Sequence, residues 1–379
     1  MNVCVIRNAE AESNSDIIRS IDAFSHLGIN LLLLTRTRST EFHRHEVLKK
    51  SLNYNDKLID NYEIQMNSEM DKGLKNLFKL FKYQMKVAFW LIKNRDKFDT
   101  VHSYDLDTGL PTLIACKFIN KQFVYHISDF FVESRSGIPE KLKNLVRKLE
   151  YSVINRAQAT IICTEERKEQ IKGSTPKALY VIHNSPVNIA NYNADNDVKP
   201  EKIKLSYVGG LINVRFISEV LEIISKDDNF YLELAGIGPL SYLAESYSKQ
   251  YSNIDFLGKV SYEEALKIYS KTDLMFAIYD PAVPNHKFSA PNKVYEAMML
   301  GKPIIVAKDS GVDKIVDKEK IGFVINYSKD DFQNLLKSIV ENPSQLELYS
   351  SNSKEAYKKY SWEAMKDKYK EIYDSIQHD

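Results

Sequence analysis

Short apolar runs alternate with amphipathic stretches along most of this 379-residue chain, and the pattern starts twice. The run 3–6 is followed by apolar residues at helical spacing up to Gly28 and then by the run 31–35. Strands this short and this uniformly apolar suit a parallel sheet that helices cover on both faces. The same order resumes at Ile203–Val208. At roughly 100–200 residues per domain, we predict an α/β fold of two Rossmann-like domains.

The predicted domains are residues 1–188 and 201–358, joined by the polar linker 189–200. Ligands of open parallel sheets bind beyond the carboxyl ends of the strands, so we expect the two sheets to face a central cleft that holds the site. Residues 359–379 carry apolar side chains at helical spacing. Such a terminal helix must bury this stripe, either on its own domain or by crossing back to the N-terminal domain.

Charge and cysteine content bear on partners and compartment. The chain has 52 Lys and Arg against 51 Asp and Glu, so it has no overall excess of positive charge of the kind that binds nucleic acid. Residues 1–188 carry 28 basic and 22 acidic residues (+6), and the remainder carries 24 and 29 (−5).

Cys4, Cys116 and Cys163 lack zinc-binding spacing and are predicted to be buried free thiols. Without a signal peptide or an apolar stretch of about 18 residues, a cytoplasmic location is expected.

Segment 71–97 has eight basic and two acidic residues and an apolar stripe along one helical face. If the stripe is buried, the segment is an ordinary core helix, which is the interpretation we favour for the whole stripe. If it is exposed, the segment is an interfacial helix for an anionic membrane, where each basic residue contributes about 1 kcal/mol. The +6 charge of this half favours peripheral membrane contact. The stripe consists of Leu74, Leu77, Phe78, Phe81, Met85, Phe89 and Trp90.

Residues 288–305 read FSAPNKVYEAMMLGKPII and predict a helix that Gly301 and Pro303 terminate. Ser289 is the expected N-cap, with Pro291 in the first turn. The free N–H groups of such a first turn, together with Lys293, form a candidate anion site. Glu296 lies one turn further on, where it either accepts hydrogen bonds from a diol such as ribose or is simply solvated.

Two glycine-rich turns follow apolar runs in the second half. Gly209 and Gly210 precede Arg215, so the turn either admits a phosphate or is only a turn. Gly236 and Gly238 lie in a turn that lacks the dinucleotide fingerprint, so no nicotinamide cofactor is expected.

These motifs occur in an order that resembles the GT-B fold glycosyltransferases of family 4, which are retaining and use nucleotide sugars. The resemblance runs over nearly the whole chain and is most specific in its C-terminal half. It rests on VHSYDLDTGLP (101–111), ATIICTEE (159–166), VIHNSPV (181–187), YVGGLINVR (207–215), LAGIGPL (234–240), IDFLGKVSYEEALKIYSKTDL (254–274) and SAPNKVYEAMMLGKPII (289–305).

The resemblance implies roles for residues of the donor half. Arg215 would meet the donor diphosphate, and Gly210 stands where many members have an arginine. Asn292, Lys293 and Val294 would cradle the β-phosphate, and Glu296 would hold the ribose hydroxyls. Leu257 and Lys259 would frame the base, and Gly236 and Gly238 would let the backbone approach the donor.

The family's first glutamate is replaced here by Phe288, so Asn285 and His286 are candidates for sugar contacts, with an exposed loop as the alternative for His286. In the N-terminal half, His126 and Asp129 are the catalytic candidates implied near the reacting sugar, although Asp129 would also suit a turn cap.

Four further polar residues of the N-terminal half are candidates for contacts or metal binding. Asp105 and Asp107 are acceptor candidates, but we favour Asp107 as an N-cap. His43 and His45 make a poor metal pair.

The sequence as a whole therefore predicts a retaining hexosyltransferase. It would move a sugar from a nucleoside diphosphate sugar to a carbohydrate or lipid-linked saccharide, in cell-surface polysaccharide or glycoconjugate synthesis. No metal and no cofactor besides the donor are expected. A nucleotide-sugar epimerase on the same fold and a non-catalytic donor-binding subunit are the alternatives. The basic half would be the acceptor half, where a membrane or an anionic lipid-linked substrate is met.

Overall fold

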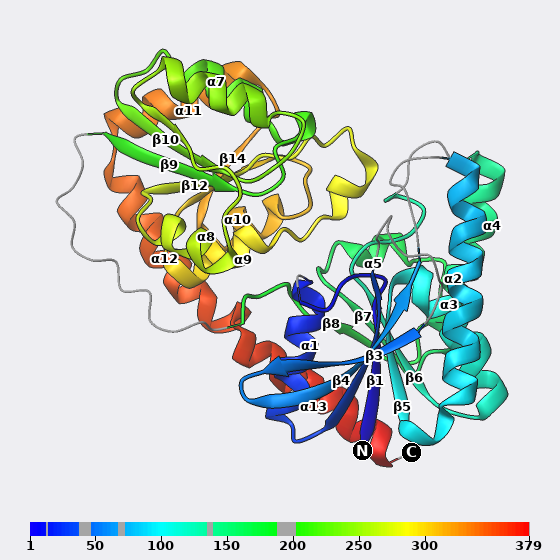
Figure 1. Ribbon diagram of the computed structural model, residues 1–379. Coiled ribbons are helices and arrows are strands. Elements are labelled where there is room, and N and C mark those ends of the chain that lie inside the picture. Colours follow the sequence, from blue (N-terminus) through cyan, green and yellow to red (C-terminus); the bar gives the residue numbers. More distant parts are fainter. Residues whose placement is uncertain (13, 38–46, 67–72, 135–138, 188–201, 379) are drawn as a thin grey trace. The chain divides into compact units, whose positions relative to one another are not determined.

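The computed structural model describes residues 1–12, 14–37, 47–66, 73–134, 139–187 and 202–378, without the side chains at 73–77 and 378 (Figure 1). The expected linker 189–200 and the pair His43 and His45 lie outside these ranges. The chain divides into two compact units, Met1–His183 with Met365–Asp379, and Asn184–Ala364. The sequence had placed the first boundary at 188 and the start of the returning helix at 359.

The first unit contains an eight-stranded sheet in the order β3-β4-β2-β1-β5-β6-β7-β8. Every neighbouring pair is parallel except β3 and β4. The strands are β1 Asn2–Ile6, β2 Asn30–Thr37, β3 Val47–Tyr54, β4 Lys57–Gln65, β5 Thr100–Tyr104, β6 Phe123–Ile127, β7 Ala159–Ile162 and β8 Leu179–Val181.

The hairpin of β3 and β4 was not expected from the sequence. Its turn is formed by Asn55 and Asp56, whose φ angles of 48° and 61° match the two-residue turns that fit the twist of a hairpin. Strand β3 is mostly exposed at the edge of the sheet and carries Lys49 and Lys50. An edge strand of this kind lacks the apolar run by which the other strands were recognised.

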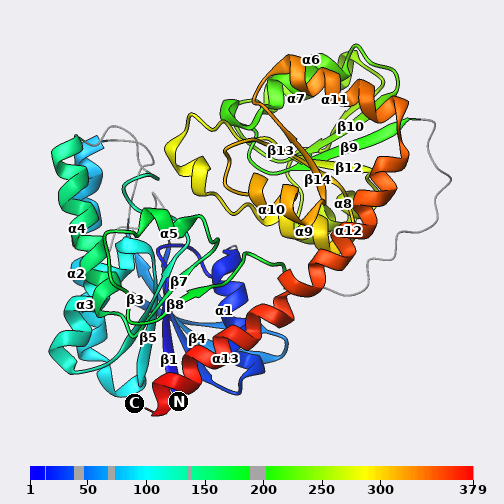
Figure 2. The same ribbon diagram turned by 180° about the vertical axis from the view of Figure 1, so that it is seen from behind.

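Helices cover both faces of the first sheet (Figures 1 and 2). On one face lie α2 Gly73–Lys93, α3 Asp105–Ile119 and α4 Glu140–Arg156, and the short α5 Arg167–Gln170 follows β7. On the other lie α1 Ser15–His26, capped by the Asn14 side chain, and α13 Trp362–His378. The ring of Phe24 on α1 meets that of Tyr373 on α13 at 4.8 Å, so the terminal stripe is buried in this unit. All three cysteines are buried and free, as predicted.

The second unit contains a six-stranded parallel sheet in the order β11-β10-β9-β12-β13-β14. This is the 3-2-1-4-5-6 order of Rossmann folds, in which chain order reverses between the first and fourth strands, here β9 and β12. The first sheet reverses in the same way between β1 and β5. The strands are β9 Ile203–Val208, β10 Phe230–Ala235, β11 Ile254–Phe256, β12 Leu274–Ala277, β13 Ile304–Ala307 and β14 Gly322–Ile325.

The helices of the second unit also form two layers (Figure 1). One contains α6 Ile217–Ile224, α7 Ser241–Gln250 and α11 Lys329–Glu341, and the other contains α8 Tyr262–Ser270, α9 Asn292–Leu300, α10 Asp313–Glu319 and α12 Ser344–Tyr360. Within the described ranges, none of the helices has the length and apolar character needed to cross a membrane.

Candidate functional site

Two basic side chains lie near the carboxyl edge of the second sheet, where chain order reverses. Arg215 ends the short helix η2 Asn213–Arg215 after β9, and its guanidinium carbon lies 3.5 Å from the ring centroid of Tyr279, which follows β12. Lys293 is in the first turn of α9, with its Nζ 4.7 Å from the ring centroid of Tyr207 on β9. Reversal points of this kind are where open α/β sheets bind ligands.

Neither cation forms an ion pair with any of the described residues. Among the described residues, the side chains of Arg215 and Lys293 make no ion pair and no hydrogen bond, and Arg215 Nε is buried without a partner. Both cations act on the same phenol: burial raises the pKa of Tyr207, and Lys293 and Arg215 oppose that rise. Burial also disfavours charge on Lys293, but the neighbouring tyrosines and Glu296 outweigh it and hold its pKa above the usual range. The edge therefore presents two charged groups with free hydrogen-bonding capacity.

Helix α9 adds its amino terminus to this edge. It begins at Asn292, and Pro291 is the N-cap, so no side chain caps the first turn. The expectation that Ser289 is the cap was wrong: Pro291 already takes that position, and the Ser289 hydroxyl instead donates to the Ser310 carbonyl. An uncapped helix start leaves N–H groups and the positive end of the helix dipole available to an anion.

The remaining α9 candidates differ in exposure. Glu296 is only 4% exposed, which rules out the solvated alternative. It lies one turn after Lys293 and contributes to holding that lysine charged. Val294 is fully buried, so it can offer only its backbone, whereas Asn292 is half-buried.

Three of the four glycines at this edge have too little room for a Cβ atom. A Cβ on Gly236, whose φ is +134°, would lie 1.8 Å from the Gly209 carbonyl oxygen, and one on Gly238 would lie 2.3 Å from that of Leu211. A Cβ on Gly209 would lie 2.8 Å from Lys293 Nζ. Gly210 has open space around it. Close approach of two loops thus explains Gly236 and Gly238, whereas at Gly209 the crowding comes from the end of the Lys293 side chain. Gly210 is the one of the four with room for a larger side chain.

The outer candidates lie on neighbouring loops of the same unit. Leu257 is 45% exposed and Lys259 is also exposed. Asn285 and His286 belong to the short helix η3 Pro284–Phe288. The alternative that His286 is an exposed loop residue was wrong, because it is buried and its Nδ1 lies 2.8 Å from the Asp280 carbonyl oxygen.

The first unit has a polar cavity of about 270 Å³ at its own reversal point, beyond β1 and β5. The sequence had not marked Arg7, which lies at the centre of this region. Its guanidinium pairs with Asp105 and, at 2.9 Å, with Asp16. The cavity is lined by Arg7, Asn8, Ala9, Asn14, Tyr104, Asp105, Asp107, Asp129 and Ser134.

Asp105 has an unusual setting in this cavity. It begins α3 with a positive φ of 54°, which is a strained backbone for a non-glycine residue, and one carboxylate oxygen accepts from the amides of Ser128 and Asp129. Burial raises its pKa to about 6 although Arg7 opposes the rise. The prediction that Asp107 caps this helix was wrong: the N-cap is Tyr104, and Asp107 accepts a 2.8 Å hydrogen bond from Asn8.

The two catalytic candidates have different environments. His126 is 5% exposed, stacks on Tyr104 and has its Nδ1 3.2 Å from His102 Nε2. Burial keeps the pKa of His126 well below its usual value, so it is neutral. Asp129 lines the cavity, with its carboxylate 3.6 Å from Arg167. Of the two, only Asp129 is placed to touch a molecule in the cavity, and the role of His126 stays a prediction.

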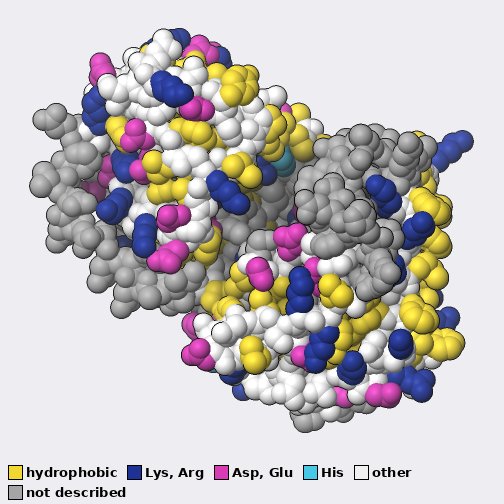
Figure 3. Space-filling model, in the orientation of Figure 1, with side chains coloured by type: hydrophobic (Ala, Val, Ile, Leu, Met, Phe, Trp, Pro, Cys, Tyr) yellow, Lys and Arg dark blue, Asp and Glu magenta, His cyan; other side chains and the backbone are white. Residues whose placement is uncertain are grey.

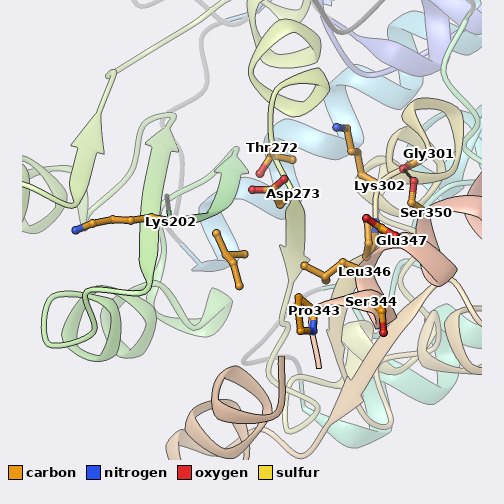
Figure 4. Close-up of a pocket in the computed structure, with 12 residues that line it drawn as sticks. Lys202, Thr272, Asp273, Gly301, Lys302, Pro343, Ser344, Leu346, Glu347 and Ser350 are labelled. Atoms are coloured by element: carbon orange, nitrogen blue, oxygen red, sulfur yellow. Dashed lines mark hydrogen bonds between the residues drawn. The ribbon is translucent and has the colours of Figure 1, made fainter. Parts of the chain in front are cut away.

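A larger cavity of about 500 Å³ lies elsewhere in the second unit, at the amino ends of β9, β12 and β13 (Figure 4). In this cavity, the Asp273 carboxylate accepts a hydrogen bond from the Lys204 amide, and burial lowers the pKa of Lys302. This cavity is at the opposite edge of the sheet from Arg215 and Lys293.

Within the described ranges, no three His, Cys, Asp or Glu side chains are grouped to hold a metal ion.

Comparisons with known proteins bear on the second unit and on the fold of the whole chain. Residues 188–359 match the family model of glycosyl transferases group 1. An uncharacterised glycosyltransferase of Methanocaldococcus jannaschii is 23% identical over 173 residues, 45% of this chain and 47% of the relative, so the match spans about half of that protein.

Solved structures match over the full length. Sucrose-phosphate synthase of Thermosynechococcus elongatus has a TM-score of 0.76 at 15% identity, covering 100% of this chain and 99% of the other. HepE of Anabaena, solved in complex with UDP, has a TM-score of 0.71 at 13% identity, covering 99% and 100%.

The protein therefore has the predicted GT-B fold of two Rossmann-like units. Its segment 188–359 is similar to the group 1 glycosyl transferases, and this similarity supports a glycosyltransferase.

Proposed function

We propose that the protein transfers a sugar from a nucleoside diphosphate sugar to a hydroxyl group of a saccharide, free or lipid-linked, with retention of configuration. The observation that carries this proposal is the pair Arg215 and Lys293, two cations without an anionic partner among the described residues. Together with the uncapped start of α9, they match the charge of a diphosphate. Glu296, one turn further along α9, is proposed to hold the ribose hydroxyls.

The proposed chemistry follows from this charge. In sugar transfer, negative charge develops on the leaving diphosphate, and preorganised cations and N–H groups stabilise it as the glycosidic bond breaks. The rest of the rate enhancement would come from positioning the acceptor hydroxyl. We propose that Arg215, Lys293 and the helix terminus do this without a metal ion, so transfer should persist in a chelator.

The cavity beyond β1 and β5 is the proposed acceptor site. It is rich in carboxylates, and its one arginine is already engaged by Asp16 and Asp105. Carboxylates and amides are good partners for sugar hydroxyls, whereas an anionic group would be repelled. The positive charge of this half is therefore not placed at this cavity, and we propose an acceptor whose reacting sugar is uncharged. A lipid-linked acceptor would bring the protein to the cytoplasmic face of a membrane, as in cell-surface polysaccharide synthesis.

The test is transfer from a panel of nucleotide sugars to saccharide acceptors, with the anomeric configuration of the product read by NMR. We expect transfer with retention that persists in EDTA. A donor that is isomerised without any acceptor would identify an epimerase instead. Donor binding without transfer to any acceptor would identify a donor-binding subunit, which the absence of an arginine at Gly210 and the presence of Phe288 make the main competitor.

A further inference from the structure

Helix α2 exposes a row of large apolar side chains on the side that faces away from the core. Phe78, Phe81, Met85 and Phe89 are 62%, 58%, 55% and 68% exposed. They recur every three or four residues and therefore share one face of the helix. The opposite side already supplies the core, with Tyr83, Val87, Ala88, Trp90 and Leu91 all buried. The expectation that the whole stripe is core was therefore wrong.

The two helices beside α2 extend this surface. On α3, Ile114 and Phe118 are 57% and 74% exposed, and on α4, Leu145 and Leu149 are 55% and 38% exposed. Helix α3 packs against both α2 and α4. In Figure 3, apolar side chains with lysines among them follow the edge of the unit where α2 and α4 lie. We call these eight residues, Phe78, Phe81, Met85, Phe89, Ile114, Phe118, Leu145 and Leu149, the apolar face. So many exposed large side chains mark an interaction site.

Positive charge surrounds the apolar face. Helix α2 carries Lys75, Lys79, Lys82, Lys86 and Lys93 and has no Asp or Glu anywhere between residues 73 and 93. Lys82 lies against the surface itself, with its Nζ 4.7 Å from the ring centroid of Phe78. The exposed residues Lys117 on α3 and Lys141 and Lys148 on α4 add to it.

We propose that the apolar face docks onto the surface of an anionic lipid bilayer, with its aromatic side chains at the boundary of headgroups and acyl chains. Apolar residues flanked by lysines are the composition that binds such an interface, since hydrophobic insertion and attraction to anionic headgroups act together. A second copy of this chain fits less well. A symmetric dimer through this face would bring the lysines of one α2 against those of the other.

This proposal does not depend on the sugar reaction. The cations of the donor site, Arg215 and Lys293, belong to the other compact unit and are not part of the apolar face. A binding assay without any nucleotide sugar or saccharide therefore tests the docking alone, and a failure of either proposal leaves the other standing.

The experiment is cosedimentation of the full chain with vesicles of phosphatidylcholine, with or without about 30% phosphatidylglycerol. We expect binding to the anionic vesicles that weakens at high salt. The variant Phe81→Ser/Phe89→Ser should bind at least about tenfold more weakly, because two insertions are lost. Neutralising Lys79, Lys82 and Lys93 to Gln should cost on the order of 100-fold, at about fivefold per lysine. Circular dichroism checks that these surface variants fold.

A matched control uses the same substitutions on the other unit. Leu348 on α12 is 58% exposed and Lys337 on α11 is exposed, so Leu348→Ser and Lys337→Gln should leave binding unchanged. Absence of binding to anionic vesicles would overturn the proposal. So would equal binding by the apolar-face variants and the controls. Dimerisation in solution that Phe81→Ser/Phe89→Ser abolishes would also overturn it and assign the face to a second copy.

Discussion

Replacing Lys293 by Ala tests the donor site most directly. The ammonium group lies over the Tyr207 ring and makes no hydrogen bond or ion pair among the described residues, so its three N–H donors are available to a ligand. Its pKa is held above the usual range, so it is charged at neutral pH. If it binds a diphosphate, the substitution removes a charge-assisted hydrogen bond of about 1.5–3 kcal/mol. Affinity for a nucleoside diphosphate should then fall by about 10- to 150-fold.

The weaker binding expected for Lys293→Ala can be measured as a smaller increase in Tm when the ligand is added. At a ligand concentration of about 100 Kd, binding adds about 2.7 kcal/mol to the unfolding free energy of the unit that holds the site. For a domain of 150–250 residues, this corresponds to an increase in Tm of roughly 5–11 °C. A variant with about 30-fold weaker binding retains about 0.9 kcal/mol, or roughly 2–4 °C, at the same concentration.

The assay is differential scanning fluorimetry with UDP and other nucleoside diphosphates, followed by transfer kinetics with the donor that binds best. Lys302→Ala is the matched control, because Lys302 follows the other end of α9 and lines the cavity at the opposite edge of the sheet. We expect the control to keep the full increase in Tm and Lys293→Ala to lose most of it. A full increase in Lys293→Ala would refute the assignment of this edge to the diphosphate. A loss in Lys302→Ala alone would move the site to the other cavity.

Two further predictions concern stability. Gly236→Ala places a Cβ 1.8 Å from the Gly209 carbonyl oxygen, at a φ of +134°. Urea unfolding of this variant should show an unfolding free energy lower by about 3 kcal/mol. Gly210→Ala is the control, because the space around Gly210 is open, and it should change the unfolding free energy by less than about 1 kcal/mol. Equal effects at the two glycines would contradict the packing argument. Burial raises the pKa of Glu150 to about 8, although its carboxyl accepts from the Tyr125 hydroxyl and the Phe131 amide. The folded chain thus keeps a proton that the unfolded chain loses above about pH 4.5, so the unfolding free energy should fall as pH rises towards 8, by up to about 1.4 kcal/mol per pH unit. Urea titrations between about pH 7.5 and 8.5, where histidines of the unfolded chain are mostly neutral, should show this slope in the wild type and not in Glu150→Gln. The same slope in both would assign it to another group.

Much of the fold was predictable because each buried parallel strand corresponds to a short run of consecutive apolar residues in the sequence. Strand β9, for example, begins and ends at the predicted residues Ile203 and Val208. The edge hairpin was missed, since an exposed strand such as β3 carries lysines and has no apolar run. Its turn, Asn55 and Asp56, was the one local signal that could have revealed it.

Parts of the donor site were predictable for a similar reason. Lys293, Glu296 and the start of α9 are close in sequence, so a helical period is enough to relate them. The cavity of the first unit was not predictable in this way. Asp105 is 98 residues from Arg7 in the chain, and only the parallel pairing of β1 with β5 brings the two together.

The sequence by itself determined where most buried strands and their helices lie, the order in which they alternate, and which glycines and charged residues follow those strands, because these depend on local apolar runs and on a period of 3.6 residues. Only the tertiary structure decided which charges are paired. Arg7 is neutralised by two carboxylates, whereas Arg215 and Lys293 lie against aromatic rings and form no ion pair within the described residues. It also decided that α2 buries one apolar side and exposes another. Burial and pairing depend on what a strand or helix packs against, and a local pattern does not specify that partner.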